Sequence, residues 1–432
     1  MQTSVKKGGV DDVGPVPVRK DCGTKRSPRC KGCKRKRNPR LEASPVGVVR
    51  EEWKDRFPAW MQFFLTWLIG CPFKGQRPLI ANKPWWLAVA IPVAILALGL
   101  ATAFACVMIG GEAMVLLPIA WLMEVHGART LQVHICHQGV HGNLTGISWL
   151  DQLIVEVVST LLLIQSEEDY RNDHCGTHHP ALASSEDPDR QFTVEIMGLQ
   201  PGRSVAQNLV AFFGSMLSPK IHAIFAIGRV RSNLTTNSRI RRLAALAWIA
   251  FVAVIVAMFI GPIEFILTVF IPLVILYSLS AMCQFVTEHF WVTTRLPGQS
   301  AKEHNNALLI NRHLGDPLPS TDCTGVDWLW QWSLWWMRLW FYHLPFRVGV
   351  LVGDLPVHGS HHMWPKESRW TEALYSFRER SEASGKTPTE FVGGYFALLH
   401  QVLESFATEK RQTASATRNL DLSEAIKVAN GM

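Results

Sequence analysis

The sequence predicts an all-α integral membrane protein, with four transmembrane helices in two hairpins and a helical cap on the cytosolic side. Two observations lead to this fold class. The apolar residues of the 432-residue chain are concentrated in long runs, and most histidines lie in clusters within the polar segments between and after these runs. A hydrocarbon core of about 30 Å needs roughly 20 apolar helical residues. We expect spans near residues 85–109, 113–133, 243–261 and 263–283.

The two hairpins differ in how clearly their spans are marked. The run from Trp85 to Gly111 contains no charged side chain and is long enough for one crossing. The apolar run from Ala113 to Met123 is shorter, and we expect its helix to continue towards Val140 and leave the bilayer. In the second hairpin, Gly261 and Pro262 separate two apolar runs and suit a tight turn between antiparallel spans.

The distribution of charge predicts the orientation. The chain has a net charge of +8, and the segment 19–40 is dense in Lys and Arg. Basic residues also lie between the hairpins, whereas the hairpin turns Gly110–Glu112 and Gly261–Glu264 contain none. Because basic segments favour the cytosolic side, both termini and every histidine cluster are expected there. The N-terminus lacks a signal-peptide pattern, so the first span is expected to direct insertion.

Composition divides the chain into three regions. Residues 1–56 form a basic segment that is expected to be disordered, residues 57–405 the membrane domain, and residues 406–432 a polar tail. The basic segment holds Cys22, Cys30 and Cys33, but three cysteines without a nearby histidine make a poor zinc site, so a solvated tail is favoured.

Two further apolar stretches are too short or too interrupted to span. They are Ala59–Ile69 and the Trp-rich stretch Trp328–Phe346, which we interpret as interfacial helices. A packing face against the cytosolic domain is the alternative for the Trp-rich stretch.

Three clusters hold most of the sixteen histidines. In the first, HICHQGVHG, His137 and His141 lie one helical turn apart, with His134 a turn earlier on nearly the same side. Two imidazoles at this spacing can bind one metal ion. The second cluster is DHCGTHHP and the third is HGSHHMWP. Neighbouring His-His residues in these two clusters point about 100° apart on a helix, so their rings can serve different metals or lie on opposite sides of one. This arrangement suits a site with two metals. Lone histidines are expected to be ordinary hydrogen-bonded residues.

The order HxxxH, HxxxHH, HxxHH, with the third box after the second hairpin, resembles the membrane fatty-acid desaturase and hydroxylase superfamily over roughly Pro84 to Pro365. The stretches HQGVHGNL, DYRNDHCGTHHP and DLPVHGSHHMWP are similar to the boxes of bacterial acyl-lipid desaturases. In that family another histidine follows the fourth span, and here His289 in QFVTEHFW has this position. The resemblance implies nine ligands for two iron ions: His137, His141, His174, His178, His179, His289, His358, His361 and His362. His134 is an extra candidate that could instead support a ligand or simply pack.

Carboxylates near the boxes have two possible roles. They could hydrogen-bond the second nitrogen of metal-bound histidines, or they could lie on a solvated surface. The candidates are Asp173, Glu168, Glu288 and Asp354. Asp354 begins the stretch DLPVH, where the similar family form usually has Asn, so its role as a holder of water or as a ligand stays open.

The resemblance implies an oxidoreductase that uses O2 and two reducing equivalents to remove hydrogen from a methylene of a fatty acyl chain. Loss of a second hydrogen gives a double bond, the favoured outcome. The alternative is a membrane di-iron hydroxylase or monooxygenase of an alkyl or acyl chain, because the spacing in the second box and the Glu288-His289 pair are similar to membrane alkane monooxygenases.

The expected partners are the bilayer, an acyl-chain substrate and a separate electron donor (ferredoxin, rubredoxin or reductase), because no heme-binding HPGG stretch is present. No nucleic-acid partner is expected. A membrane zinc hydrolase would need only three protein ligands, and a metal transporter would hold its ligands within the spans, so both are less favoured.

Overall fold

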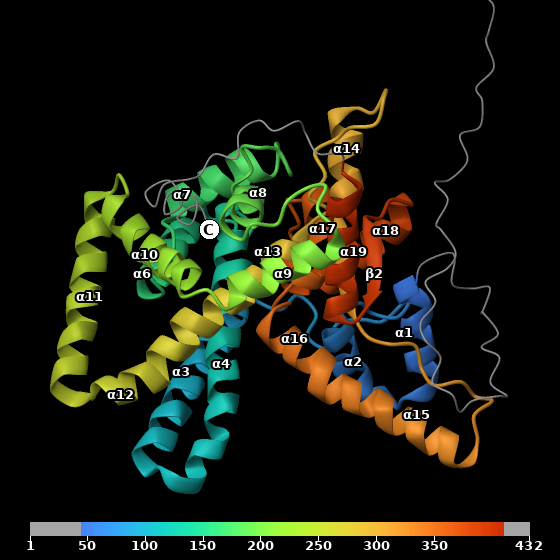
Figure 1. Cartoon of the computed structure of the whole chain (residues 1–432), viewed down its shortest axis with the longest axis horizontal. Helices are drawn as coiled ribbons and strands as arrows, with labels where there is room; N and C mark the ends of the chain where they lie inside the picture. The colour runs from blue at the N-terminus through green and yellow to red at the C-terminus, as the bar shows by residue number, and fades with distance from the viewer. Residues whose placement is uncertain (1–44, 410–432) are drawn as a thin grey trace, which may run out of the picture.

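The computed structural model describes residues 45–409 (Figure 1). Most of the predicted basic tail, including Cys22, Cys30 and Cys33, and most of the C-terminal tail lie outside the described residues. The described chain is mostly helical, in agreement with the predicted class. Its departure from an all-α fold is a short parallel sheet of β1 (Ile310–Leu314) and β2 (Thr389–Gly393).

The first hairpin consists of α3 (Trp85–Ile109) and α4 (Leu117–Thr130), joined by the 3-10 helix η3 (Gly111–Leu116). Two glycines allow the helices to approach closely. A Cβ at Gly99 would lie 2.9 Å from the Cγ of Glu124, and one at Gly127 would lie 2.7 Å from the Cβ of Leu96. The chain continues beyond α4 without a break, through the π-helix η4 (Leu131–Cys136) into α5 (His137–Val140).

Three described helices are long and apolar enough to cross a membrane: α3, α11 (Arg239–Phe259) and the continuous helix Pro262–Glu288. A fourth candidate is the pair α9 (Val205–Met216) and α10 (Pro219–Thr235), which is bent by 60°. The helix at the predicted second span is not among them, because it carries Glu124, His126 and Arg129. The four-span topology therefore stays a prediction.

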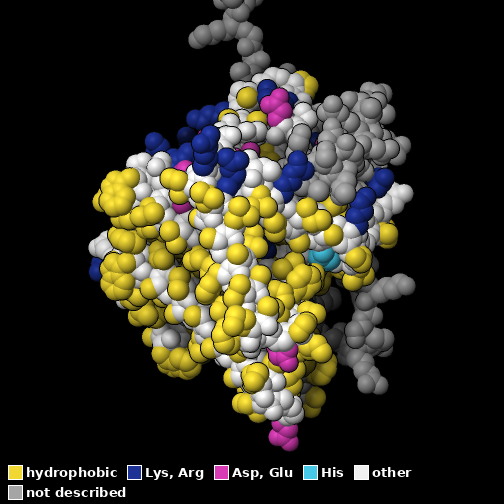
Figure 2. All heavy atoms as spheres, turned by 90° about the vertical axis from the view of Figure 1, so that its left-hand side faces the viewer, with side chains coloured by type: hydrophobic (Ala, Val, Ile, Leu, Met, Phe, Trp, Pro, Cys, Tyr) yellow, Lys and Arg dark blue, Asp and Glu magenta, His cyan; other side chains and the backbone are white. Residues whose placement is uncertain are grey.

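The helix Pro262–Glu288 comprises α12 (Pro262–Phe265), the π-helical η7 (Ile266–Leu276) and α13 (Tyr277–Glu288). Pro272 lies within η7, and because proline has no N–H, it cannot make an α-helical hydrogen bond there. The outer helix α11 exposes Phe251, Met258 and Phe259. Figure 2 faces this side and shows a broad apolar surface, with Lys and Arg side chains gathered above it. Such a surface is consistent with an integral membrane protein.

Most of the other helices form the cap above the hairpins (Figure 1), and the pair α9 and α10, a candidate bent span, adjoins them. Between the hairpins they are α6 (Ser148–Leu161), α7 (Glu167–Arg171), the π-helix η5 (Asn172–His178), α8 (Pro188–Gln191), the π-helix η6 (Phe192–Ile196), α9 and α10. After the second hairpin they are α14 (Ala301–Leu308), η9 (Leu355–Val357), α17 (His358–Met363), η10 (Trp370–Glu372), α18 (Ala373–Ser384) and α19 (Tyr395–Thr408). The main core joins cap and hairpins, since Phe192 and Tyr395 of the cap share it with Tyr277 of α13.

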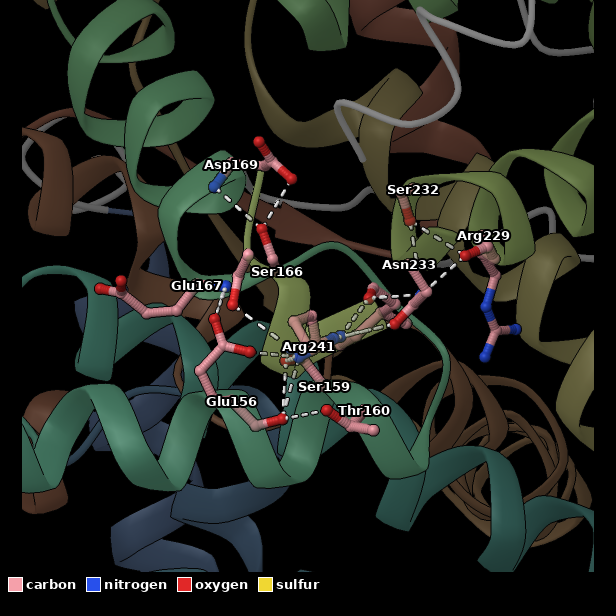
Figure 3. Close-up of polar contacts among 12 residues, drawn as sticks. Glu156, Ser159, Thr160, Ser166, Glu167, Asp169, Arg229, Ser232, Asn233 and Arg241 are labelled. Atoms are coloured by element: carbon pink, nitrogen blue, oxygen red, sulfur yellow. Dashed lines mark hydrogen bonds and ion pairs between the residues drawn. The ribbon is translucent and has the colours of Figure 1, made fainter. Parts of the chain in front are cut away.

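Arg241, near the start of α11, ties three helices together (Figure 3). Its guanidinium donates to the side-chain oxygen of Asn233 in α10, at 2.7 and 3.1 Å, and to Ser159 Oγ of α6 at 2.7 Å. It also forms an ion pair of 2.5 Å with Glu156 and donates to the carbonyl of Ile164 at 3.0 Å. Because Ile164 lies in the loop before α7, Arg241 anchors the segment that leads into the second histidine box.

A smaller second core lies beside the cap. It is built from α1 (Pro45–Arg56), η2 (Ala59–Met61), α2 (Gln62–Ile69) and the Trp-rich helix α15 (Gly325–Arg338), which continues through η8 (Leu339–His343) and α16 (Leu344–Gly349). Trp335 is buried against Trp53 and Phe57, so one face of α15 packs as a core element. On its other side Trp330 and Phe341 are 67% and 78% exposed. The Trp-rich stretch thus has a packing face and an exposed apolar face.

Candidate metal centre

Four separate elements present the predicted histidines. The first box lies on the continuation of α4 into α5, the second on η5 and the adjoining residue, and the third on α17. In the second box the π-helical backbone bonds His179 N–H to His174 C=O at 3.0 Å, so these residues lie one wide turn apart. His289 directly follows α13, in extended backbone that forms a bridge with Leu309.

The third box is held in place by β1. A Cβ at Gly359 would lie 2.8 Å from the backbone of Ile310, so only glycine permits this approach of α17 to the strand. Asn311 then forms two hydrogen bonds with Ser360, from its amide to the hydroxyl at 2.9 Å and from the Ser360 N–H to its carbonyl at 3.0 Å. The glycine and serine of HGSHH therefore position the histidines.

The structure brings all nine predicted histidines together in two groups. Within each group, one ring nitrogen of each histidine lies within 4.8 Å of the corresponding nitrogens of the others. The first group contains His137, His141, His174, His179 and His361, and the second contains His178, His289, His358 and His362. Each adjacent pair, His178-His179 and His361-His362, sends one ring to each group, as the divergence of neighbouring helical residues suggests.

The spacing of the ring nitrogens fits metal ligands. Four Nε2···Nε2 contacts measure 2.8 Å (His137–His174), 3.1 Å (His174–His179), 3.0 Å (His141–His361) and 3.0 Å (His358–His362). With metal–nitrogen distances of about 2.1 Å, ligands at right angles lie about 3.0 Å apart and tetrahedral ligands about 3.4 Å. The observed values match the first arrangement.

Burial keeps seven of these imidazoles in the neutral form that binds metals. Burial, together with the neighbouring imidazoles, holds the pKa values of six of them well below the usual value; these are His137, His174, His179, His289, His361 and His362. Burial likewise lowers the pKa of His141 to about 4. In the described chain, both nitrogens of His289 and the Nε2 of His178 are buried without a hydrogen-bond partner, as expected of groups whose partner is an ion.

His178 has a carboxylate partner that sequence reasoning missed. Its Nδ1 lies 2.9 Å from Asp187 and 3.5 Å from Asp189. Asp187 is fixed in turn by the N–H groups of Ala183 and Asp189, at 2.7 and 3.0 Å. Although burial lowers the pKa of His178, the two carboxylates outweigh it and raise the pKa to about 10. The one sequence signal was an acidic residue before Pro188, a helix-capping pattern that does not point to a histidine.

The four carboxylates proposed from the sequence have different surroundings. Glu288 contacts a predicted ligand, because its Oε1 lies 3.0 Å from His358 Nε2. Asp173 instead accepts a hydrogen bond from Gln165, and Glu168 is exposed. The candidates from the sequence thus include one direct partner of the second histidine group.

Asp354 belongs to a separate pair with His134. One carboxylate oxygen lies 2.9 Å from His134 Nδ1, and the other accepts from Gln138 at 2.9 Å. Burial raises the pKa of Asp354, but the neighbouring His134 outweighs this and holds the pKa below the usual range. His134 lies outside both histidine groups. The structure thus places it beside Asp354, as a support and not among the clustered rings.

A cavity borders both histidine groups. Its wall includes His137 and His174 of the first group and His178 and His358 of the second. Polar side chains from the hairpin helices, Gln132, Gln284 and Glu288, also line it. Gln132 and Gln284 both accept hydrogen bonds from the buried Arg129, so the inner wall is a connected polar network.

A sequence model of the fatty acid desaturase family matches residues 113–372. The matched segment contains all three histidine boxes and His289. A comparison with curated proteins gives no match.

Proposed function

We propose that this chain, which belongs to the fatty acid desaturase family, introduces a double bond into a fatty acyl chain with O2 at a di-iron centre. Membership of the family implies an oxidation of the desaturase or hydroxylase type. The observation that carries the proposal is the division of nine buried or half-buried histidines into groups of five and four. We propose these nine residues as the iron ligands.

Three features support iron over zinc. A zinc site uses three or four protein ligands, fewer than the five imidazoles of the first group. The nitrogen spacings near 3.0 Å suit ligands at right angles better than the tetrahedral arrangement that zinc prefers. Finally, oxidation of an unactivated C–H bond needs a redox-active metal, and imidazole sets bind iron well.

The chain's own residues prepare the site for this chemistry. When bound, the metal pair supplies the oxidising power that acids and bases of a protein lack. When a metal is bound, Asp187 would accept a hydrogen bond from His178 Nδ1–H, which leaves the lone pair of Nε2 for the metal. Gly359 and Asn311 fix α17, and with it His358, His361 and His362, against β1. Burial of the rings excludes water that would compete for the reactive positions.

Hydroxylation of an alkyl or acyl chain is the second candidate. Both reactions begin with removal of one hydrogen, and they differ in whether a second hydrogen leaves or an oxygen atom is added. The Glu288-His289 pair favours keeping this candidate, because the sequence pair is similar to membrane alkane monooxygenases and Glu288 here contacts the second histidine group.

The test is mass spectrometry of total lipids and acyl thioesters from cells that express the wild type or His361→Ala. New species lighter by about two mass units in the wild type alone support desaturation, and species heavier by about sixteen support hydroxylation. His400→Ala is the matched control, because His400 is exposed and lies outside both groups. Full activity of His361→Ala would contradict the ligand assignment.

Metal analysis gives an independent test. The purified wild type should hold close to two iron ions per chain. One zinc ion would support a hydrolase, and loosely held mixed metals would support a transporter. We also propose that the histidine groups face the cytosol, where a separate ferredoxin, rubredoxin or reductase supplies the electrons.

A further inference from the structure

One helix of the cap has an apolar face that points away from the rest of the protein. Helix α6 lies between the first and second histidine boxes, and every fourth residue along it is apolar and exposed. These residues form the outer stripe of α6, with exposed fractions between 49% and 65%: Trp149, Leu153, Val157 and Leu161. An amphipathic helix on the surface of a soluble domain turns its polar side outward, so α6 has the reverse arrangement. Its outer stripe is suited to an apolar environment.

The inner side of α6 is fixed to the segment that carries the first box. Val155 is fully buried, and a Cβ at Gly139 of that box would overlap with its side chain. Asp151 accepts a hydrogen bond of 2.8 Å from the N–H of Thr145, in the loop after the box. Ser159 is also fully buried. These buried residues recur every four positions, opposite the outer stripe. Because this side is clamped, α6 cannot rotate to bury its outer stripe.

The outer stripe of α6 meets the exposed apolar surface of α11. Trp248 of α11 donates from its indole N–H to the carbonyl of Leu161, at the end of α6, at 3.0 Å. Its ring also stacks on that of Phe251, which is 55% exposed on the outside of α11. Helix α11 is long and apolar enough to cross a membrane. The environment that covers α11 therefore also reaches α6.

Contacts with α11 also set the level of α6. Arg241, near the start of α11, donates to Ser159 of α6 at 2.7 Å, and Trp248 binds the end of α6. At about 1.5 Å per residue, Arg241 and Trp248 lie about 10 Å apart along α11. The end of α6 therefore lies beside the first turns of the 21-residue α11. Lys and Arg side chains gather just above the apolar surface on this side of the molecule (Figure 2).

We propose that α6 lies in the plane of the membrane, with its outer stripe inserted at the boundary between lipid headgroups and acyl chains. Helices of this kind bury their apolar face about 5–10 Å deep at this boundary, where tryptophans such as Trp149 are favoured. Arg239, which is exposed at the start of α11, suits anionic headgroups. Because α6 joins the first two boxes, its insertion holds the candidate metal centre at the membrane surface. The inference does not depend on which metal the centre binds.

The test uses the full-length protein in vesicles of phosphatidylcholine and phosphatidylglycerol. The lipids carry a nitroxide either near the start or near the end of one acyl chain. A fluorescent NBD label at Leu153→Cys reports contact with each quencher. Val254→Cys, in the middle of α11, is the deep reference, and Glu186→Cys, on the exposed cap, is the aqueous control. All three positions are exposed, so the label does not disturb packing. Wild type treated with the same reagent gives the background from native cysteines.

We expect the shallow nitroxide to quench the label at Leu153 several-fold more strongly than the label at Glu186. The deep nitroxide should be the stronger quencher at Val254 and the weaker one at Leu153. Equal quenching at Leu153 and Glu186 would show that α6 faces water and would overturn the inference. If the label at Leu153 escapes both nitroxides while Leu153→Cys forms an intermolecular disulfide, a second copy of the chain covers α6 and lipid contact is refuted.

Discussion

Replacement of Arg241 by Met should loosen the segment that carries the second histidine box. Met has a similar length and keeps the apolar packing, but it removes every hydrogen bond of the guanidinium. Arg241 is 3% exposed, and its partners Asn233 and Ser159 are fully buried. Ile164 C=O still accepts from Asn233 Nδ2 at 3.0 Å after the change, so this acceptor is not lost.

The expected cost follows from the partners that remain. The side chain of Glu156 is 34% exposed, so its carboxylate can regain water and contributes little. The oxygens of Asn233 and Ser159 stay buried and lose their charged donor. Each such group costs about 1–3 kcal/mol, which gives about 2–6 kcal/mol in total. The melting temperature should fall by roughly 2–8 °C, because a chain of this size has a large unfolding entropy.

The assay is thermal unfolding in detergent, followed by the fraction of protein that remains monodisperse, with iron content measured on the same samples. Arg239→Met is the control, because Arg239 is exposed on the same helix. Iron should be lost from Arg241→Met at a lower temperature than from the control, since Arg241 holds the loop before α7. Equal melting temperatures of the two variants would refute the role of Arg241 as an anchor.

Three further predictions concern the hairpin, the histidine environment and the topology. Gly127→Leu should destabilise the α3–α4 contact by about 1–3 kcal/mol, because even a Cβ there would lie 2.8 Å from a backbone nitrogen. Asp187→Asn should lower the melting temperature of the metal-free protein more near pH 6.5 than near pH 10. The pKa of His178 is raised to about 10, so the folded protein binds this proton more tightly than the unfolded chain does. The resulting stabilisation is fully present below about pH 6.5 and is lost as the pH rises through 10. In intact cells an impermeant thiol reagent should label Glu112→Cys and spare Lys302→Cys.

Each of these has a control. For the hairpin it is Gly214→Leu, since a Cβ at Gly214 would have open space; equal losses in both variants would contradict the close-approach argument. For the pH dependence the control is Glu186→Gln, because Glu186 is an exposed neighbour of Asp187. If Asp187→Asn lowers the melting temperature equally at both pH values, the argument from His178 is wrong. For the topology, labelling of Lys302→Cys alone would reverse the predicted orientation.

The spacing of the histidines and the family resemblance that it supports predicted much of the candidate site. The nine histidines that gather in two groups are the nine chosen from the boxes and from His289. The division of His178-His179 and His361-His362 between the groups also follows from helix geometry. Within each box, the spacing depends on residues within a few turns of one another. The apolar runs around α3, α11 and Pro262–Glu288 are likewise local, so their helices could be predicted from composition.

Contacts between distant segments could be decided only by the tertiary structure. Asp187 supports His178 because the chain turns back after the second box, and Glu288 reaches His358 from another helix. Asp354 was ambiguous until it was found beside His134. The length of an apolar helix depends only on its own residues. The space for the polar Glu124 of α4, in contrast, is provided by the neighbouring helix α3, which has a glycine, Gly99, at the point of contact. Residue spacing and the family resemblance therefore predicted which histidines gather, while long-range packing decided which carboxylates support them.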